Sequence, residues 1–422
     1  MKTLISFIGT GPLTEASGSS QREYRKATYS IDGKIIGESS FVASVLLDHL
    51  NFDAIYLIGT AKSMWEEAYQ YFAHKNNVEF NEEEYWKLVE KIDKANHKTD
   101  PDSIDLSAVK TVLGENSNAV CIPYGLNRKE QIQIFSRLGD LFSQINPQDE
   151  IVLDVTHSFR SLPLFATSVI QYFKSLSKDI KFEKVYYGML EAMNEFDKIA
   201  PIIDISTAIE LQQWTTAAYS FKEYGKGQLL ADLLGGEEGK VIQIFSDAVN
   251  LNYLSEIQQR LVNFQKIAEE GLENEFAQWV VPQVLDSFVK RLFKAGTTQH
   301  LFQYELSVWH REKQNYGSAY IVFVESIITY ICEKGKVDWK AKKNRENAKE
   351  VILTFDDYHK SYPFKLNLEW KVQSEIREIY TKANHIRNNI AHNLSRRSNK
   401  AQTDIADLVK FQKEFKTILQ KT

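Results

Sequence analysis

The alternation of short apolar runs with amphipathic segments through the first two hundred residues constrains the fold more than any other feature. Runs of this kind are typical of buried strands, and they lie at residues 3–9, 54–59, 119–125, 150–156 and 184–190. Amphipathic helical segments lie at 61–75, 129–144 and 162–176, and another follows Ser39 or Ser40, the expected N-cap. Strands that alternate with helices build βαβ units, so the pattern predicts a Rossmann-like parallel sheet.

A β-hairpin is predicted between the first strand and its helix. The segment A-T-Y-S-I-D-G-K-I-I-G-E, residues 27–38, has Asp32-Gly33 at its centre. Asp-Gly suits a type I′ turn, in which both central residues have positive φ. We therefore expect the loop above the sheet to carry a small β-ribbon of its own.

The second half of the chain is predicted to be helical. Strand signals end near Asp204, and little proline follows to break helices. Residues 319–331 are apolar nearly all round, which predicts a buried helix, whereas residues 235–239 and 334–347 are typical of loops. The fold class is therefore α/β plus all-α, divided into residues 1–205, a helical connector at 206–298 and a final helical domain at 299–422.

Composition and charge limit the classes of function. The 422 residues are 43% apolar and 25% charged, which is ordinary for a globular chain of two or three domains. The net charge of −5 argues against nucleic-acid binding by bulk charge, so any basic site must be local. Cys121 and Cys332 lie in apolar runs and predict core residues in a reducing compartment. With no run of signal or membrane length, we expect a cytoplasmic protein without a membrane partner.

Polar turns follow several of the predicted strands, where ligands of open parallel sheets bind. They are Gly9-Thr10-Gly11, Gly59-Thr60-Ala61, residues 124–127 and residues 154–161. Each turn by itself is also compatible with a tight strand-to-helix connection. Together they supply N–H groups, hydroxyls, a histidine and an arginine, which favour a phosphate-bearing ligand. Because G-x-G-x-x-G is absent, a dinucleotide dehydrogenase is disfavoured.

The same turns carry a family resemblance. F-I-G-T-G, Y-L-I-G-T-A and D-V-T-H-S-F-R-S resemble the CARF sensor domain of type III CRISPR accessory proteins. The family signature Asp-x-Thr-His-Gly is matched at Asp154, Thr156 and His157, with Ser158 in place of glycine. The resemblance implies a homodimer that binds a cyclic oligoadenylate, with a HEPN ribonuclease domain as output. The expected ligand-binding residues are Gly9, Thr10, Gly11, Thr60, Thr156, His157, Ser158 and Arg160.

The stretch H-I-R-N-N-I-A-H-N near the C-terminus matches the Arg-x₄-His pattern of HEPN nucleases at Arg387 and His392. On a helical wheel, an apolar stripe is expected to face the core, formed by Ile376, Ile379, Ala383, Ile386 and Ile390. Asn384, Asn388 and His392 then line the opposite side. A solvated helix face is the alternative interpretation.

The chemistry of RNA cleavage explains why two copies of this helix are expected. Cleavage without metal needs a base, an acid and a cation for the developing phosphorane charge. Two helices across a two-fold axis supply two histidines and two arginines, as the family resemblance implies, and Asn388 can orient His392. The predicted catalytic residues are Arg387, Asn388 and His392. Glu325 in the apolar helix is expected to pair with Arg377 or Arg387, or to face water at an edge of the bundle.

The function expected from the sequence is a metal-independent endonuclease for single-stranded RNA in type III CRISPR antiviral defence. Its allosteric activator is a cyclic oligoadenylate, with four adenylates favoured and six next; no cofactor, metal or DNA partner is expected. One alternative is a ligand-sensing regulator without nuclease chemistry. In another, His157 also cleaves the bound ring. Ring size, RNA sequence preference and ring degradation stay open.

Overall fold

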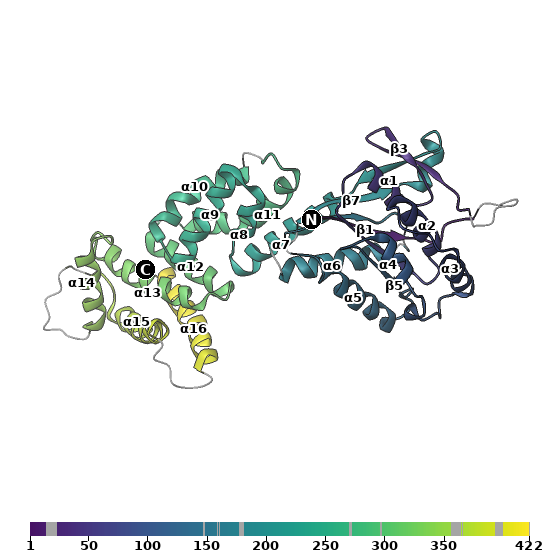
Figure 1. Cartoon of the computed structure of the whole chain (residues 1–422). Helices are drawn as coiled ribbons and strands as arrows, with labels where there is room; N and C mark the ends of the chain where they lie inside the picture. Colours follow the sequence, from purple (N-terminus) through teal and green to yellow (C-terminus); the bar gives the residue numbers. More distant parts are fainter. Residues whose placement is uncertain are drawn as a thin grey trace. The chain divides into compact units, whose positions relative to one another are not determined.

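The computed structural model describes residues 1–13, 23–146, 148–157, 159, 161–176, 181–269, 272–295, 298–355, 364, 366–392 and 400–421. The chain divides into two compact units, Met1–Glu210 and Leu211–Thr422, each described here by itself (Figure 1). The three-part division expected from the sequence stays a prediction.

The first unit is built on an eight-stranded mixed sheet with the order β3-β2-β8-β7-β6-β1-β4-β5. The strands are β1 (Lys2–Ile8), β2 (Ala27–Ile31), β3 (Lys34–Ser39), β4 (Ala54–Thr60), β5 (Asn118–Ile122), β6 (Glu150–Asp154), β7 (Lys181–Gly188) and β8 (Ile199–Asp204). Five of them, from β7 to β5, are parallel neighbours. The predicted α/β class and the five predicted strands are confirmed.

The edge of the sheet beyond β7 differs from the prediction. β8 was not expected, because Pro201 lies inside it and proline argues against a strand. β8 runs antiparallel to β7 and parallel to β2, so the hairpin β2-β3 joins the sheet instead of standing above it as a separate ribbon. The predicted turn is confirmed, because Asp32 and Gly33 have φ of 50° and 76°.

Helices cover both faces of the sheet, since successive residues of a strand point to opposite sides. Leu4 and Ile8 of β1 pack in one core cluster with α1, α2, α3 and α4, and Ile5 and Phe7 pack in another with α5 and α6. The helices are α1 (Val42–His49), α2 (Trp65–Lys75), α3 (Glu82–Lys94), α4 (Ser107–Leu113), α5 (Arg128–Phe142) and α6 (Leu162–Leu176), with short 3₁₀ turns η1 (Pro101–Ser103) and η2 (Leu190–Glu195).

Two details of these helices differ from the sequence prediction. Neither Ser39 nor Ser40 is the N-cap of α1; that position is Phe41, because Ser39 still belongs to β3. The Ser39 hydroxyl accepts a hydrogen bond from the Phe41 N–H at 3.4 Å. The helices α3 and α4 had no predicted counterpart.

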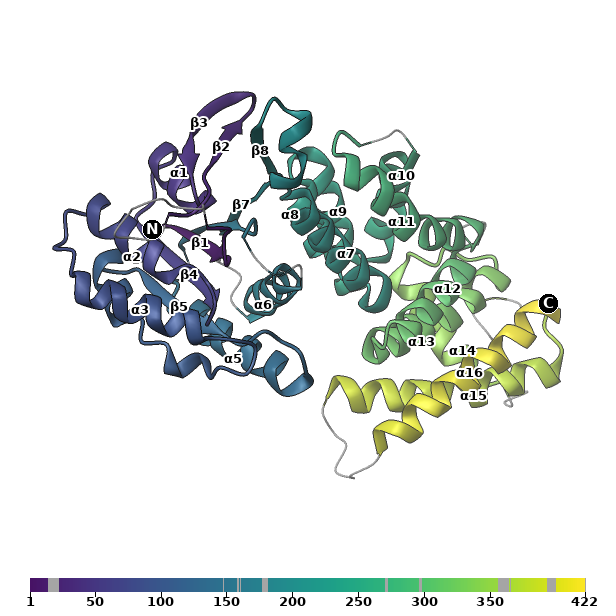
Figure 2. The same cartoon turned by 90° about the vertical axis from the view of Figure 1, so that its right-hand side faces the viewer.

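The second unit is helical in all its described elements. It contains α7 (Thr207–Tyr224), which begins just before the boundary, α8 (Gln228–Leu234), α9 (Gly236–Leu251), α10 (Leu254–Glu269), α11 (Glu275–Ala295), α12 (Gln299–Glu312), α13 (Tyr316–Lys334), α14 (Lys342–Leu353), α15 (Trp370–Ala391) and α16 (Lys400–Lys421). One core cluster lies among α7 to α12 and another among α12 to α16, and α12 and α13 contribute to both. The helices α15 and α16 pack against each other (Figure 2).

The two predicted loops of this half are shorter than expected. Only Gly235 separates α8 from α9, and Gly239 lies inside α9. A Cβ at position 239 would lie 2.5 Å from the Ala231 carbonyl oxygen, so glycine lets the two helices approach closely. Between α13 and α14 only residues 335–341 form a loop, because Lys342 already begins α14. The predicted apolar helix is confirmed within α13, where most side chains are buried.

Two further findings concern the whole described chain. Cys121 and Cys332 are buried and free, which confirms them as core residues. Among the described residues, no helix combines the length and apolar character that crossing a membrane requires.

Candidate functional site

The main candidate site is a pocket of about 580 Å³ in the first unit, at the carboxyl ends of β1, β4 and β6. Six of the eight predicted ligand-binding residues line it, namely Gly9, Thr10, Gly11, Thr60, Thr156 and His157. Ser158 and Arg160 lie outside the described residues. The structure therefore brings the polar turns of three different strands to one cavity.

The first two turns are held together through Ser63. Its hydroxyl donates to the Ile8 carbonyl at 2.8 Å and accepts from the Thr60 N–H at 2.9 Å. Gly11 has a φ of +50°, and a Cβ there would lie 2.5 Å from the Met64 Cε atom. The Tyr24 ring would lie 2.7 Å from the same Cβ, so this wall of the pocket favours glycine at position 11.

Asp154 shapes the third turn from beneath the pocket. Its carboxylate accepts hydrogen bonds from the Thr156 N–H at 3.0 Å, the Thr156 hydroxyl at 2.6 Å and the Ser6 hydroxyl at 2.5 Å. The Thr156 hydroxyl in turn accepts from the Gly188 N–H at 2.7 Å. Burial raises the pKa of Asp154. These contacts position the following residue, His157, at the pocket wall.

His157 is a neutral side chain near pH 7. Burial lowers its pKa to about 4, because the charged imidazolium loses its hydration. Its Nε2 atom lies 3.4 Å from the hydroxyl oxygen of Tyr29 on β2, whose pKa burial raises. The hairpin thus supplies a partner for His157. The sequence prediction had placed the hairpin apart from the sheet and did not suggest this contact.

The pocket is also lined by three cationic side chains that the sequence prediction missed. Arg25 and Lys26 precede β2, and Lys198 precedes β8. No aspartate or glutamate is found among the described lining residues, so the cavity is electropositive. The basic pair before the hairpin was visible in the sequence, but its place at the pocket follows from the way the hairpin joins the sheet.

The second candidate site lies at the end of α15. Its apolar stripe is confirmed for Ile376, Ile379, Ala383 and Ile386, which are at most 6% exposed. The prediction is wrong for Ile390, which is 45% exposed, because the last turn of α15 extends beyond the core that packs against the preceding turns. α15 ends at Ala391 with His392 as its C-cap, and the next residues of the expected helix lie outside the described residues.

The predicted catalytic residues lie close together in sequence on this last turn. Arg387 and Asn388 are half-buried and His392 is exposed. The His392 N–H donates to the Asn388 carbonyl at 3.0 Å, whereas within the described residues no side-chain bond joins the two. His385 and Asn389 form a separate pair at 3.1 Å. One copy of the helix therefore presents two exposed histidines, His385 and His392, and of these His385 is hydrogen-bonded to Asn389.

Glu325 is paired differently from the prediction. Its partner is Arg345 of α14, not Arg377 or Arg387, because α14 packs against α13 where Glu325 lies. Arg345 also donates to the Thr329 hydroxyl and the Trp339 carbonyl, each at 3.3 Å. The ion pair therefore fixes α14 on α13.

No cluster of three metal-ligating side chains occurs among the residues that the structure describes.

Two models of known protein families match the chain, one in its first half and one in its second half. Residues 3–189 match the family model of the CARF domain of CRISPR system endoribonuclease Csx1. Residues 210–297 match the model of the second domain of CRISPR-associated protein MJ1674.

The CRISPR-associated protein MJ1674 of Methanocaldococcus jannaschii is 32% identical over 410 residues, which cover 93% of this chain and 62% of that protein. The chain thus spans about 62% of the length of this relative. Among solved structures, Enterococcus italicus Csm6 bound to cyclic hexa-2'-fluoro-hexa-dAMP matches 99% of this chain and 94% of its own, with 15% identity and a TM-score of 0.38.

The family matches agree with the strand-end motifs and the pocket that these motifs build. They confirm the CARF resemblance drawn from the sequence, whereas the individual site residues stay predictions. Residues 3–189 match the CARF domain of Csx1, and the chain is similar over 93% of its length to a CRISPR-associated protein.

Proposed function

We propose that the chain is a metal-independent endonuclease for single-stranded RNA, activated by a cyclic oligoadenylate in type III CRISPR defence. The observation that carries the proposal is the electropositive pocket of the CARF domain, with three cations and no described carboxylate. The matched family model describes Csx1 as an endoribonuclease, which supports the same output here. A phosphodiester ring suits the pocket because its charges meet cations and strand-end N–H groups.

The ring is proposed to bind across a homodimer. Exposed apolar side chains lie on α5, on α6 and just before α6: Ile132, Phe135, Phe159, Leu164, Tyr172 and Leu176. Leu164, Tyr172 and Leu176 are spaced by multiples of four and so share one side of α6. Phe159 lines the pocket and is 39% exposed. A second copy on this face would cover apolar surface and bring two pockets together.

The ribonuclease domain is proposed to be residues 299–422, with 1–205 as the sensor and 206–298 as the connector. A single α15 exposes one His392, but cleavage at a 2′-OH needs both a base and an acid. Two copies provide two histidines, and two Arg387 side chains stabilise the phosphorane charge. Asn388 lies one turn before His392 and positions it. The products are 2′,3′-cyclic phosphate and 5′-hydroxyl ends.

A continuous route along the chain links the pocket to the second unit. Lys198 lines the pocket and is followed by β8, which leads directly into α7. A ring that binds Lys198 can therefore bias β8 and, through the chain, α7. For activation the ring must bind the active arrangement more tightly than the resting one, by about 1.4 kcal/mol for each tenfold shift.

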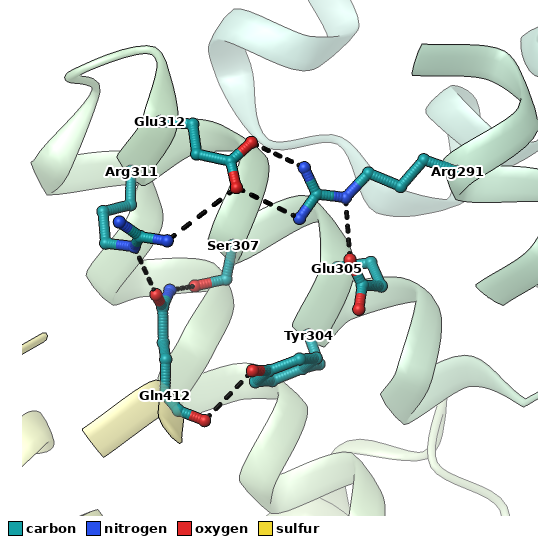
Figure 3. Close-up of polar contacts among 7 residues, drawn as sticks. All are labelled: Arg291, Tyr304, Glu305, Ser307, Arg311, Glu312 and Gln412. Carbon is teal, nitrogen blue, oxygen red and sulfur yellow. Dashed lines mark hydrogen bonds and ion pairs between the residues drawn. The ribbon is translucent and has the colours of Figure 1, made fainter. Parts of the chain in front are cut away.

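Inside the second unit, a polar network joins the connector helix α11 to α16 through α12. Its members are Arg291, Tyr304, Glu305, Ser307, Arg311, Glu312 and Gln412 (Figure 3). Arg291 donates to Glu305 at 2.7 Å and to Glu312 at 2.6 Å, and Arg311 donates to Gln412 at 2.7 Å. Because Gln412 lies on α16, which packs on α15, a shift of α11 is proposed to reach the helix of His392.

The test is RNA cleavage in EDTA with a panel of defined cyclic oligoadenylates. A fluorescent single-stranded RNA should be cut only when a ring is added, with four adenylates most effective and six next. No cleavage with any ring, despite ring binding, would leave a sensing regulator as the function. A requirement for added metal would contradict the catalytic assignment to His392.

Slow cleavage of the bound ring is a second candidate function, favoured by the neutral state of His157 near pH 7. A neutral imidazole at the pocket wall can accept the proton of a ring 2′-OH. The test is chromatography of the ring after long incubation with His392→Ala protein, which lacks the RNA-cleaving histidine. An intact ring would remove this candidate.

A further inference from the structure

A second cavity, of about 600 Å³, lies within the helical unit and has no role in the function proposed above. It is formed by the start of α10, by α12, α13 and the segment that leads into α14. Its lining residues are Asn252, Tyr253, Leu254, Ser255, Glu256, Gln303, Glu325, Trp339, Lys340 and Arg345.

Two buried amide oxygens at this cavity lack a hydrogen-bond partner among the described residues. Gln303 is 1% exposed, and its Oε1 atom has no hydrogen-bond partner among the described residues. The Oδ1 atom of Asn252 is likewise buried without a partner there. Asn252 has a left-handed φ of 58°, and its Nδ2 donates to the Ser318 hydroxyl at 3.1 Å. Buried polar atoms are almost always satisfied, so these oxygens indicate a ligand that donates hydrogen bonds.

Aromatic rings, cations and the carboxylates of Glu256 and Glu325 complete the cavity, and Glu325 forms an ion pair with Arg345. Tyr253 is 57% exposed and Trp339 is half-buried, and the Lys340 ammonium lies 5.5 Å from the Trp339 ring centre. Lys342 and Lys343 occupy the first turn of α14, where the helix dipole favours acidic residues. This placement of lysines is unfavourable for the helix alone and suits an anion bound beside the cavity.

We propose that this cavity binds one nucleotide of single-stranded RNA. Its base stacks on Trp339 and donates its amino group to Gln303 or Asn252, while its phosphate contacts Lys340 and the lysines of α14. A base with an exocyclic amine, in adenine, cytosine or guanine, satisfies the orphaned oxygens better than uracil does. The inference rests on the proposed function in one respect, that RNA is the substrate.

The test measures RNA binding with the full-length His392→Ala protein, so that RNA stays intact. Fluorescence anisotropy is used with hexanucleotides of A, C, G or U, and with AMP as competitor. Trp339→Leu should raise the Kd for RNA by about tenfold, because stacking on an aromatic ring is lost. Trp339→Phe should restore most of the affinity. The matched control is Trp370→Leu, an exposed tryptophan at the start of α15, which should leave the Kd unchanged.

A second variant tests base recognition separately. Gln303→Met removes the orphaned oxygen while keeping the side-chain length, so the preference of amino-bearing bases over uracil should shrink without a fall in the thermal midpoint. Equal RNA affinity of wild type and Trp339→Leu would overturn the inference, as would an AMP affinity that matches that of RNA. RNA binding that depends on Trp339, together with no cleavage by any ring-activated protein, would reject the proposed function and retain the inference.

Discussion

The two histidines assigned to function lie in opposite surroundings. His157 is enclosed in a pocket, is neutral near pH 7 because burial lowers its pKa to about 4, and lies 3.4 Å from the Tyr29 hydroxyl. His392 lies exposed at the end of α15, bound to its neighbours only through its backbone N–H in the described structure. One site is formed within a single chain, whereas the other presents only part of what acid–base chemistry needs.

Because their surroundings differ, ligand binding at His157 and RNA cleavage at His392 are expected to need different things. A preformed pocket can select a ligand by charge and shape before any conformational change. His392 is proposed to gain its acid–base partner from a second copy, because His385 of the same helix is already hydrogen-bonded to Asn389. Binding is therefore expected to depend on the pocket of each chain, and cleavage on the pairing of two chains.

The largest effect is expected from His392→Ala. Loss of the acid–base group should lower RNA cleavage by about a thousandfold while leaving ring affinity unchanged. The matched control is His385→Ala, which removes an exposed histidine about two turns earlier on α15. A cleavage assay that finds the same loss in both variants would indicate damage to the helix rather than loss of catalysis.

Disrupting the dimer should have the next largest effect. Leu164→Glu places a charge on the exposed apolar face of α6, where a buried unpaired charge is costly. It should shift the observed mass from dimer to monomer and reduce cleavage by about a hundredfold. Trp86→Glu, at an equally large but separate exposed residue on α3, is the control. Mass photometry and cleavage are measured together. A fully active monomer would contradict the composite site.

Substitution of a pocket cation should moderately weaken binding of the ring. Arg25→Ala and Lys198→Ala should each raise the ring Kd by about tenfold, since each removes a contact to phosphate. Thr10→Ala and His157→Ala should weaken binding less. Calorimetry measures the affinity, with exposed Lys34→Ala on the hairpin as control. Unchanged affinity in all four pocket variants would remove them from the site.

The smallest effect is a dependence of stability on pH. In the unfolded chain His157 binds a proton below about pH 6.5, whereas in the folded unit it does so only near pH 4. The unfolded state therefore binds more protons between these values, and stability falls as the pH drops from 6.5 to 4. His310, whose pKa burial also lowers to about 4, acts in the same direction.

The histidine contributions are separated by substitution. His157→Gln should weaken this pH dependence by about 1–3 kcal/mol between pH 7 and pH 4.5, measured by urea unfolding. An identical dependence in wild type and variant would show that His157 does not stay neutral in the folded unit.

Local patterns allowed the parallel strands and the strand-end turns of the pocket to be predicted. Continuous apolar runs mark buried strands, and the turns after them carry the polar residues, so Thr10, Thr60 and His157 were identified correctly as lining one edge. Lys198 was missed because β8 contains Pro201 and its place in the sheet depends on pairing with β2. Such pairing between distant segments leaves no local signal.

The helical half shows the same limit. The periodicity of α15 predicted its buried stripe, but not that the core ends before Ile390, because this depends on which helices pack around it. Glu325 was expected to need a partner, and it has one. The choice of Arg345 over Arg377 or Arg387 depends on the position of α14, which the charge pattern does not specify.

The most direct test of the account is a ring titration of RNA cleavage, in EDTA, with wild type, Lys198→Ala and His392→Ala. Lys198→Ala should raise the half-activating ring concentration by about tenfold and leave the maximal rate nearly unchanged. His392→Ala should bind the ring normally and show no activation at any concentration. Cleavage by wild type without a ring, or an unchanged midpoint in Lys198→Ala, would contradict control of His392 by the CARF pocket.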